Sequence, residues 1–268
     1  MSKYIVFIFI AASCILYSCG NNSGPAESNN PVPAEEKQLR DLIDQYPDSL
    51  SLRNKLIDYF AGNSDYENAI KENNKLLMKD SSNADLWDSD ARLRFLNRDT
   101  IGAINAFVRA IRIFPDPQYI ISLSTLYAQT GNPLALSLAD TLIQKSKGAA
   151  ALEGLFIKGL YFNYAGDKIK AIFFFDECLK LNHLFLDGYR EKAIALYDLR
   201  NYTDALKVLE LETTLSKTND EAYYWIGLCY EKLGKKEEAI QNYQLAVQFN
   251  KDNIEAADAL GKLGIKTP

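Results

Sequence analysis

The chain has 268 residues, of which 47% are hydrophobic, 24% are charged and 12% are aromatic, and its formal net charge is −5. This composition is typical of a globular chain that buries a core without disulfides or metals. The mild acidic excess argues against nucleic acid as a partner, because phosphates require clustered Lys and Arg. It also provides no polybasic segment to hold the chain on an anionic membrane surface.

The sequence begins with MSKYIVFIFIAASCILYSC, which has the layout of a secretory signal. Lys3 precedes an apolar run from about Ile5 to Leu16, shorter than the roughly 18 residues that a spanning helix needs. A charged start, an apolar middle and a small residue near the end are typical of a signal that is removed. We predict a cleaved signal at residues 1–18, with an uncleaved anchor or a plain signal peptide as the alternatives.

The end of this segment, Leu16-Tyr17-Ser18-Cys19, resembles the lipobox of bacterial lipoproteins. In that motif an aliphatic, a variable and a small residue precede the cysteine that becomes lipidated. The resemblance implies that Cys19 carries fatty acyl chains such as palmitate, and that the chain is attached to a bacterial envelope membrane, the outer rather than the inner one. Residues 19–34 are rich in Gly, Asn, Ser and Pro and are predicted to form a disordered tether.

Alanines followed by an aliphatic residue recur through the rest of the chain at one period. Ala69, Ala103, Ala171, Ala205 and Ala239 are separated by 34 residues or by twice that number. One copy is missing near Ser137, where the apolar phase favours Ala135 in that role. A fixed period of this length indicates stacked supersecondary units.

The residues around these alanines carry a family resemblance. The last copy contains Gly227, Tyr230, Gly234, Ala239, Tyr243 and Ala246, an earlier one contains Gly159, Phe162, Gly166, Ala171, Phe175 and Cys178, and one near the front contains Trp87, Ala91, Ala103, Phe107, Ala110 and Pro115. The pattern resembles the tetratricopeptide repeat, a hairpin of two helices. The resemblance implies an all-α superhelical solenoid of about six hairpins over residues 51–253, with an N-terminal capping helix at 35–50 and a C-terminal one at 254–268.

Catalytic chemistry is not predicted. Cys178 and His183 are close in sequence, but Cys178 occupies a small packing position of a second helix and His183 the loop that follows it. His183 is the single histidine, so no metal-ligand spacing exists. Cys178 and Cys229 lie in different repeats, and we expect both to pack in the core rather than to form a disulfide. The sequence therefore predicts a non-enzymatic chain without cofactor or metal.

The resemblance also implies a binding surface, because in this family the first helices of successive repeats line a concave groove. The corresponding positions here are Arg92, Phe95, Ile121, Thr125, Phe156, Leu160, Asn163, Tyr164, Arg190, Ile194, Tyr197, Tyr224 and Leu228. Aromatic and Arg side chains dominate many interfaces, so an extended or helical segment with apolar anchors would suit this face. The alternative is that several of these residues belong to the core between helices.

Two functions remain open. The first is a lipid-anchored adaptor that binds other proteins or peptide segments through the groove, with membrane contact through the lipid on Cys19. The second is an envelope receptor for a peptide or glycan that stacks against the aromatic residues. The scarcity of convergent polar groups on the groove favours the adaptor. The partner's identity does not follow from the sequence.

Overall fold

The computed structural model describes residues 32–145 and 148–265, which form α-helices joined by turns, so the all-α prediction is confirmed. The predicted signal, Cys19 and most of the tether lie outside the described residues. The helices are α1 (Ala34–Gln45), α2 (Leu50–Gly62), α3 (Tyr66–Lys79), α4 (Ala84–Leu96), α5 (Thr100–Ile113), α6 (Pro117–Gln129), α7 (Leu134–Lys145), α8 (Ala149–Tyr164), α9 (Lys168–Leu181), α10 (Leu186–Asp198), α11 (Tyr202–Leu215), α12 (Asp220–Lys232), α13 (Lys236–Phe249) and α14 (Ile254–Lys262). Among these helices, none is both long and apolar enough for a membrane span.

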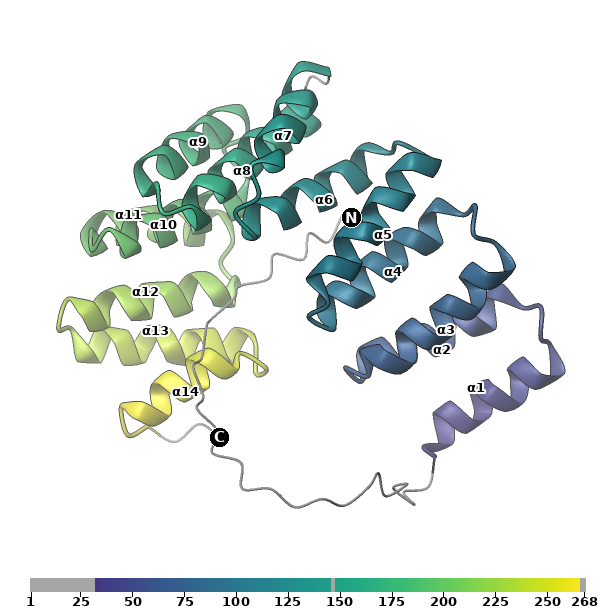
Figure 1. The fold of residues 1–268 in the computed structure, drawn as a ribbon. Coiled ribbons are helices and arrows are strands. Elements are labelled where there is room, and N and C mark those ends of the chain that lie inside the picture. Colours follow the sequence, from purple (N-terminus) through teal and green to yellow (C-terminus); the bar gives the residue numbers. More distant parts are fainter. Residues whose placement is uncertain (1–31, 146–147, 266–268) are drawn as a thin grey trace, which may run out of the picture.

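Helices α2 to α13 form six antiparallel hairpins in chain order, flanked by α1 at one end and α14 at the other. Figure 1 shows that the hairpins follow an arc and that α1 and α14 lie on opposite sides of its opening. A single hairpin exposes an apolar face, so each unit is stabilised by stacking on its neighbours. The predicted solenoid of six hairpins with terminal capping helices is therefore confirmed.

In the middle of the arc, the first helices of the hairpins form the inner layer. Helix α8 contacts both α6 and α10, and α10 also contacts α12, so first helices of successive hairpins touch one another. Figure 1 shows α6, α8 and α10 on the inner side, with α7, α9 and α11 outside them. Neighbouring units approach most closely on the inside of a curved stack. The first helices from α6 to α12 therefore build one continuous wall, which we call the inner wall.

Small residues allow the two helices of a hairpin to approach closely. A Cβ added to Gly227 in α12 would lie 2.5 Å from the ring of Tyr243 in α13, and one added to Gly159 in α8 would lie 2.4 Å from the ring of Phe175. Both rings are fully buried. In each of these two hairpins a glycine faces a large aromatic ring across the contact between the helices, which we call the seam. The missing side chain of the glycine makes room for the ring, so the contact stays close-packed.

The turn between the two helices of each hairpin contains one residue in the left-handed region. These residues are Ser64, Arg98, Gly131, Gly166, Arg200 and Gly234, with φ between 59° and 86°. They are 34 residues apart except at Gly131, which comes one residue early. In α7 the buried alanine is Ala135, two residues before the position that the period predicts, and Ser137 is exposed. The longer helix α8, with 16 residues, restores the period.

Arg98 offers a test of this turn geometry. Its φ of 62° is costly for a residue with a Cβ, whereas glycine adopts it freely. We expect Arg98→Gly to raise the free energy of unfolding by about 0.5–1 kcal/mol, measured by urea denaturation. Gly234→Ala, at the equivalent turn, should lower it by about 1 kcal/mol. A loss of stability in Arg98→Gly would show that its side chain matters more than its backbone.

The two described cysteines are free thiols in separate parts of the core. Cys178 packs in the cluster that extends from α4 to α10, and Cys229 packs in a second cluster formed by α10 to α12. Neither is exposed, and burial raises the pKa of the Cys229 thiol to about 12. The prediction that both cysteines fill packing positions is confirmed.

Candidate binding groove

The thirteen predicted groove residues all lie on first helices, namely α4, α6, α8, α10 and α12. They differ widely in accessibility. Arg92 and Tyr164 are exposed; Phe95, Thr125, Ile194, Tyr197, Tyr224 and Leu228 are half-buried; Ile121, Phe156, Leu160, Asn163 and Arg190 are buried. Eight positions therefore keep some exposed surface, and five are covered by neighbouring helices. Which of the eight contact a partner stays a prediction.

Three of the buried positions belong to the largest hydrophobic cluster of the solenoid. The ring of Phe156 lies 5.0 Å from that of Phe185 and 5.8 Å from that of Phe175, centroid to centroid. Leu160 and Ile121 are buried in the same cluster. These side chains hold α8 against its neighbours, which is the core role left open by the sequence. Sequence spacing places a residue on a helix face but does not show how closely the next hairpin covers that face.

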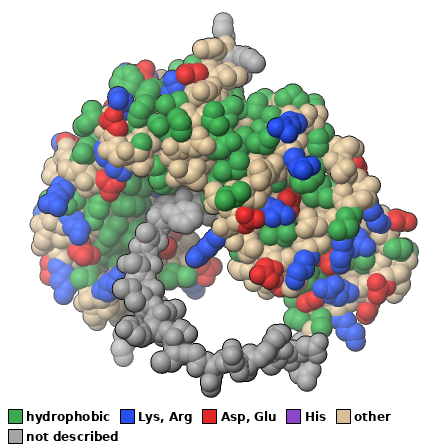
Figure 2. Space-filling view, viewed as in Figure 1, with side chains coloured by type: hydrophobic (Ala, Val, Ile, Leu, Met, Phe, Trp, Pro, Cys, Tyr) green, Lys and Arg blue, Asp and Glu red, His purple; other side chains and the backbone are tan. Residues whose placement is uncertain are grey.

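An aromatic row crosses the inner wall from α10 to α12. The ring centroids of Tyr197 and Trp225 are 5.5 Å apart, and those of Trp225 and Tyr224 are 5.9 Å apart, both in edge-to-face geometry. All three side chains are half-buried. Figure 2 shows hydrophobic side chains on the hollowed inner side of this half. Trp225 was missed by the sequence prediction, although its position beside Tyr224 on a first helix could have indicated it.

Arg190 is not a free cation on the groove. Its guanidinium donates to Asp187 of the same helix, and its Nη1 lies 2.8 Å from Glu221 Oε2 at the start of α12. A buried Arg with two carboxylate partners stabilises the stack of α10 on α12 and offers little to an anionic ligand. The two acidic partners were also missed, although Asp187 precedes Arg190 by three residues on the same helix face.

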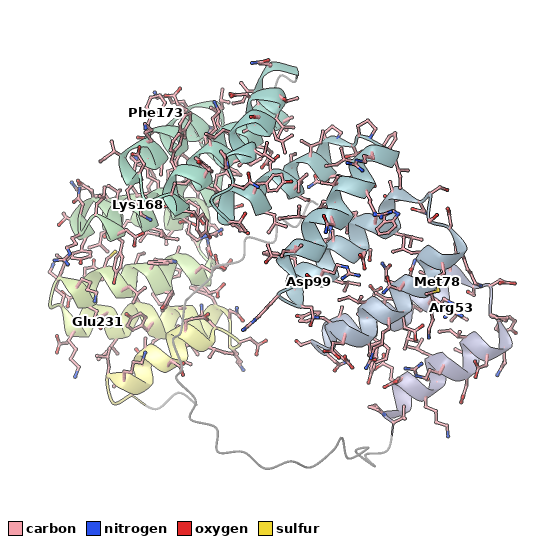
Figure 3. The ribbon with its side chains drawn as sticks, viewed as in Figure 1. Arg53, Met78, Asp99, Lys168, Phe173 and Glu231 are labelled. Atoms are coloured by element: carbon pink, nitrogen blue, oxygen red, sulfur yellow. The ribbon has the colours of Figure 1, made fainter. Side chains whose placement is uncertain are left out.

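Glu191, next to Arg190, is a buried carboxyl on the inner wall. Its Oε2 accepts a 3.5 Å hydrogen bond from Asn163 Nδ2, and Asn163 Oδ1 in turn accepts one of 2.7 Å from Lys168 Nζ. Lys168, labelled in Figure 3, also binds Asp198 at 2.6 Å. Burial raises the pKa of Glu191 to about 7, although nearby Arg190 opposes the shift. The network thus joins α8, α9 and α10 through a carboxyl that titrates near neutrality.

The N-terminal half of the groove carries a paired charge as well. Arg92 Nε lies 2.8 Å from Asp88 Oδ2 one turn earlier on α4, and burial raises the pKa of the Asp88 carboxyl. Arg92 itself is exposed. Over the helices described, no group of His, Cys, Asp and Glu is arranged to hold a metal ion. The groove therefore presents aromatic and apolar side chains next to charged residues that are already paired. Such a surface is complementary to an amphipathic segment.

Cys178 and His183, the pair with possible chemical activity, do not form a site. The Cys178 thiol is buried, and its Sγ lies 3.7 Å from the Leu152 carbonyl oxygen, to which it donates. Burial raises its pKa well above the ordinary range. His183 is exposed in the loop after α9. A neutral, buried thiol is a poor nucleophile, so packing accounts for Cys178.

Comparison with known proteins agrees with this architecture. Residues 220–253, which contain α12 and α13, match the family model of the tetratricopeptide repeat. The chain also resembles the crystal structure of a tetratricopeptide repeat protein from Parabacteroides merdae, with a TM-score of 0.69 and 16% identity over 84% of this chain and 90% of that one. The protein is an all-α superhelical repeat solenoid in which residues 220–253 match the tetratricopeptide repeat. At this identity the likeness shows the fold alone.

Other similarities of this solenoid to known proteins are partial. The Cut9–Hcn1 structure from the APC/C aligns with a TM-score of 0.53 and 20% identity over 85% of this chain and 46% of that one. Human superkiller complex protein 3 is 24% identical over 129 residues, or 48% of this chain. The chain spans 8% of the length of that relative and of its mouse counterpart. The similarity therefore concerns about half of this chain and a small part of much longer proteins.

Proposed function

We propose that the chain is a lipid-anchored scaffold or adaptor that binds other proteins, or peptide segments of them, through the groove of its inner wall. The aromatic row of Tyr197, Trp225 and Tyr224 carries the proposal, since it is half-accessible on a wall shared by several repeats. Aromatic side chains lose little entropy on binding and dominate many interfaces. An extended or helical segment with apolar anchors would bury them.

The anchor is proposed from the lipobox at Leu16 to Cys19. Treated as a flexible coil, the tether from Gly20 to Ala34 would span roughly 20 Å. The solenoid would then stay close to a bilayer and could reach membrane-bound partners. A single acyl chain binds only reversibly, so durable attachment would need the several chains that bacterial lipoproteins carry. The proposed location is the bacterial cell envelope, at the outer membrane.

Site-specific crosslinking in intact cells tests the groove. A photoreactive phenylalanine analogue at Tyr197 should give discrete crosslinked products, because this side chain belongs to the aromatic row. The same probe at Phe173 is the matched control, since Phe173 is 56% exposed but lies on the outer helix α9. Figure 3 labels this side chain. Equal products from both positions, or none from Tyr197, would place the binding surface elsewhere. A receptor for a small ligand would give no protein adduct.

A separate experiment tests the anchor. Feeding cells with an alkyne-bearing fatty acid should label the wild-type chain, and Cys19→Ser should remove the label. Cys14→Ser is the matched control, because residue 14 lies within the predicted signal and should leave labelling unchanged. Labelling that persists in Cys19→Ser would refute the lipobox assignment without affecting the groove.

A further inference from the structure

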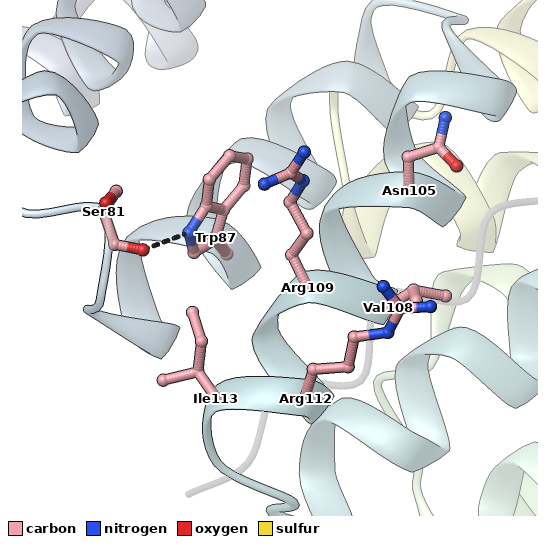
Figure 4. Close-up of a pocket in the computed structure, with 7 residues that line it drawn as sticks. All are labelled: Ser81, Trp87, Asn105, Val108, Arg109, Arg112 and Ile113. Carbon is pink, nitrogen blue, oxygen red and sulfur yellow. Dashed lines mark hydrogen bonds between the residues drawn. The ribbon is translucent and has the colours of Figure 1, made fainter.

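A pocket of about 530 Å³ opens between α4 and α5, and none of its lining residues is a predicted groove residue (Figure 4). Five of the seven lining residues come from α5, a second helix, and the lining consists of Ser81, Trp87, Asn105, Val108, Arg109, Arg112 and Ile113. Its volume lies in the range of ligand sites. None of these described lining residues is acidic, so the pocket carries two positive charges without an opposing one.

Trp87 is fixed as one wall of the pocket. Its indole Nε1 donates a 2.9 Å hydrogen bond to the Ser81 carbonyl oxygen in the loop before α4. Tyr189 and Tyr223 make the same bond, each to the carbonyl six residues earlier. The same hydrogen bond thus recurs at equivalent positions of three hairpins, where it joins the first helix to the loop that precedes it. It holds the ring in place and leaves the remaining face of the indole for other contacts.

The two arginines of the pocket are not engaged by carboxylates. The Arg109 guanidinium carbon lies 4.9 Å from the centroid of the Trp87 ring, and Arg112 has neither an ion pair nor a hydrogen bond to any described residue. Figure 4 shows Arg109 reaching toward Trp87, whereas Arg112 extends along α5 toward Val108 and Asn105. A guanidinium group whose N–H donors are not hydrogen-bonded can bind a carboxylate, so this pocket can bind two.

The same place in the other hairpins lacks this combination. Two repeats further on, the residues equivalent to Arg109 and Arg112 are Glu177 and Lys180, which pair with each other at 2.5 Å. In the last hairpin, Tyr223 packs on Phe249 with ring centroids 5.3 Å apart. A fixed aromatic ring beside two unpaired arginines is thus specific to the hairpin of α4 and α5.

We propose that this pocket binds an acidic peptide segment that carries an apolar side chain between carboxylates. Val108, Ile113 and the indole of Trp87 would receive the apolar side chain, and the two guanidinium groups would bind the flanking carboxylates. The chain as a whole is acidic, with a net charge of −5, so its surface at large disfavours such a segment. Binding would therefore be local. This second site lies outside the groove and is independent of the function proposed for it.

Peptide selection followed by titration tests the proposal. A random dodecapeptide display library is selected on the immobilised full-length chain, in parallel with the Arg109→Gln/Arg112→Gln variant. Wild type should enrich peptides in which Asp and Glu flank an apolar residue, and the variant should not. The most enriched peptide is then titrated in a Trp225→Phe background, where Trp87 is the single tryptophan and reports binding by its fluorescence.

Matched variants separate the pocket from general electrostatics. The double variant should weaken peptide binding at least tenfold. Lys180→Gln is the control, because Lys180 lies in the last turn of α9 as Arg112 lies in the last turn of α5. Removing this charge should change the affinity less than twofold. Tyr224→Ala, in the groove, should leave pocket binding unchanged. An enriched set without acidic residues, no enrichment at all, or equal affinity in the double variant would overturn the proposal and leave the groove untouched.

Discussion

Gly227→Ala should lower the free energy of unfolding by about 1–3 kcal/mol. The new Cβ would lie 2.5 Å from Cε1 of the Tyr243 ring, closer than two carbon atoms pack. The ring has no exposed surface, and its hydroxyl donates a 2.9 Å hydrogen bond to Glu231, so it has little freedom to move away. Relief would require α12 and α13 to separate. Urea denaturation followed by circular dichroism measures the change.

Gly261→Ala is the matched control for this substitution. Gly261 lies within α14, and a Cβ there would meet nothing within 4 Å. Alanine is the better helix former, so this variant should gain about 0.5–1 kcal/mol. The opposite signs of the two changes isolate the contact with Tyr243 from helix propensity. If Gly227→Ala were neutral or stabilising, the seam would be looser than the structure shows.

The chain itself supplies a compensating change. One repeat earlier, Ala193 and Leu209 occupy the positions of Gly227 and Tyr243, and both are buried in one cluster. Combining Gly227→Ala with Tyr243→Leu copies that pair. We expect the double variant to be more stable than the sum of the single changes predicts, by about 0.5–3 kcal/mol of coupling. Additive effects would mean that the two residues do not share a seam.

Much of the fold could be predicted because the same small and aromatic residue types recur at equivalent positions of the repeats. The alanines from Ala69 to Ala239 marked the second helices, and the glycines at 159 and 227 marked the seams before the structure showed the contacts. Each weak local signal was supported by the same signal one period away. The break near Ser137 followed from the sequence as well, because apolar phase pointed to Ala135, which is fully buried.

The candidate groove was less predictable, because accessibility depends on how neighbouring hairpins cover a face. Periodicity placed Phe156 and Tyr197 on the same side of their helices, yet Phe156 is buried among aromatic rings and Tyr197 is half-accessible. Charge pairing was missed for a similar reason. Arg190 pairs with Glu221 of the next repeat, and an ion pair between repeats has no fixed spacing that the sequence alone would reveal.

The pocket beside Trp87 could not be predicted from the sequence either. Trp87 was recognised as a favoured repeat residue, but Arg109 and Arg112 carry no motif of their own. Their significance arises from the absence of a carboxylate among the described residues around them, whereas the equivalent lysine, Lys180, is paired. An unpaired charge is a property of the assembled surface and cannot be read from periodicity.

Glu191→Gln should stabilise the chain at pH 8 and have no effect near pH 4. Burial raises the pKa of Glu191 from its ordinary value of 4.5 to about 7, so the folded state prefers the protonated carboxyl. Between these two values the unfolded chain loses the proton and the folded chain keeps it. Stability therefore falls as the pH rises through this window, and the loss is complete above the folded pKa. Glutamine is neutral at every pH and avoids that loss.

The size of the effect is bounded by the shift, which corresponds to up to about 3 kcal/mol at pH 8. Around Glu191, Arg190 and Lys168 favour its charge, whereas Asp187 and Glu221 oppose it, and Asn163 donates to its Oε2. Urea denaturation at a series of pH values from 4 to 8 measures the difference between variant and wild type.

Glu237→Gln provides the comparison that makes this measurement decisive. It also replaces a glutamate by its neutral isostere, but Glu237 is exposed in the first turn of α13, where a carboxylate is favoured by the helix dipole. It should therefore give no gain at pH 8. A gain shared by both variants would reflect net charge alone. Equal stability of Glu191→Gln and wild type at pH 8 would mean that Arg190 and Lys168 fully offset the burial of this carboxylate, so that the inner wall tolerates its charge.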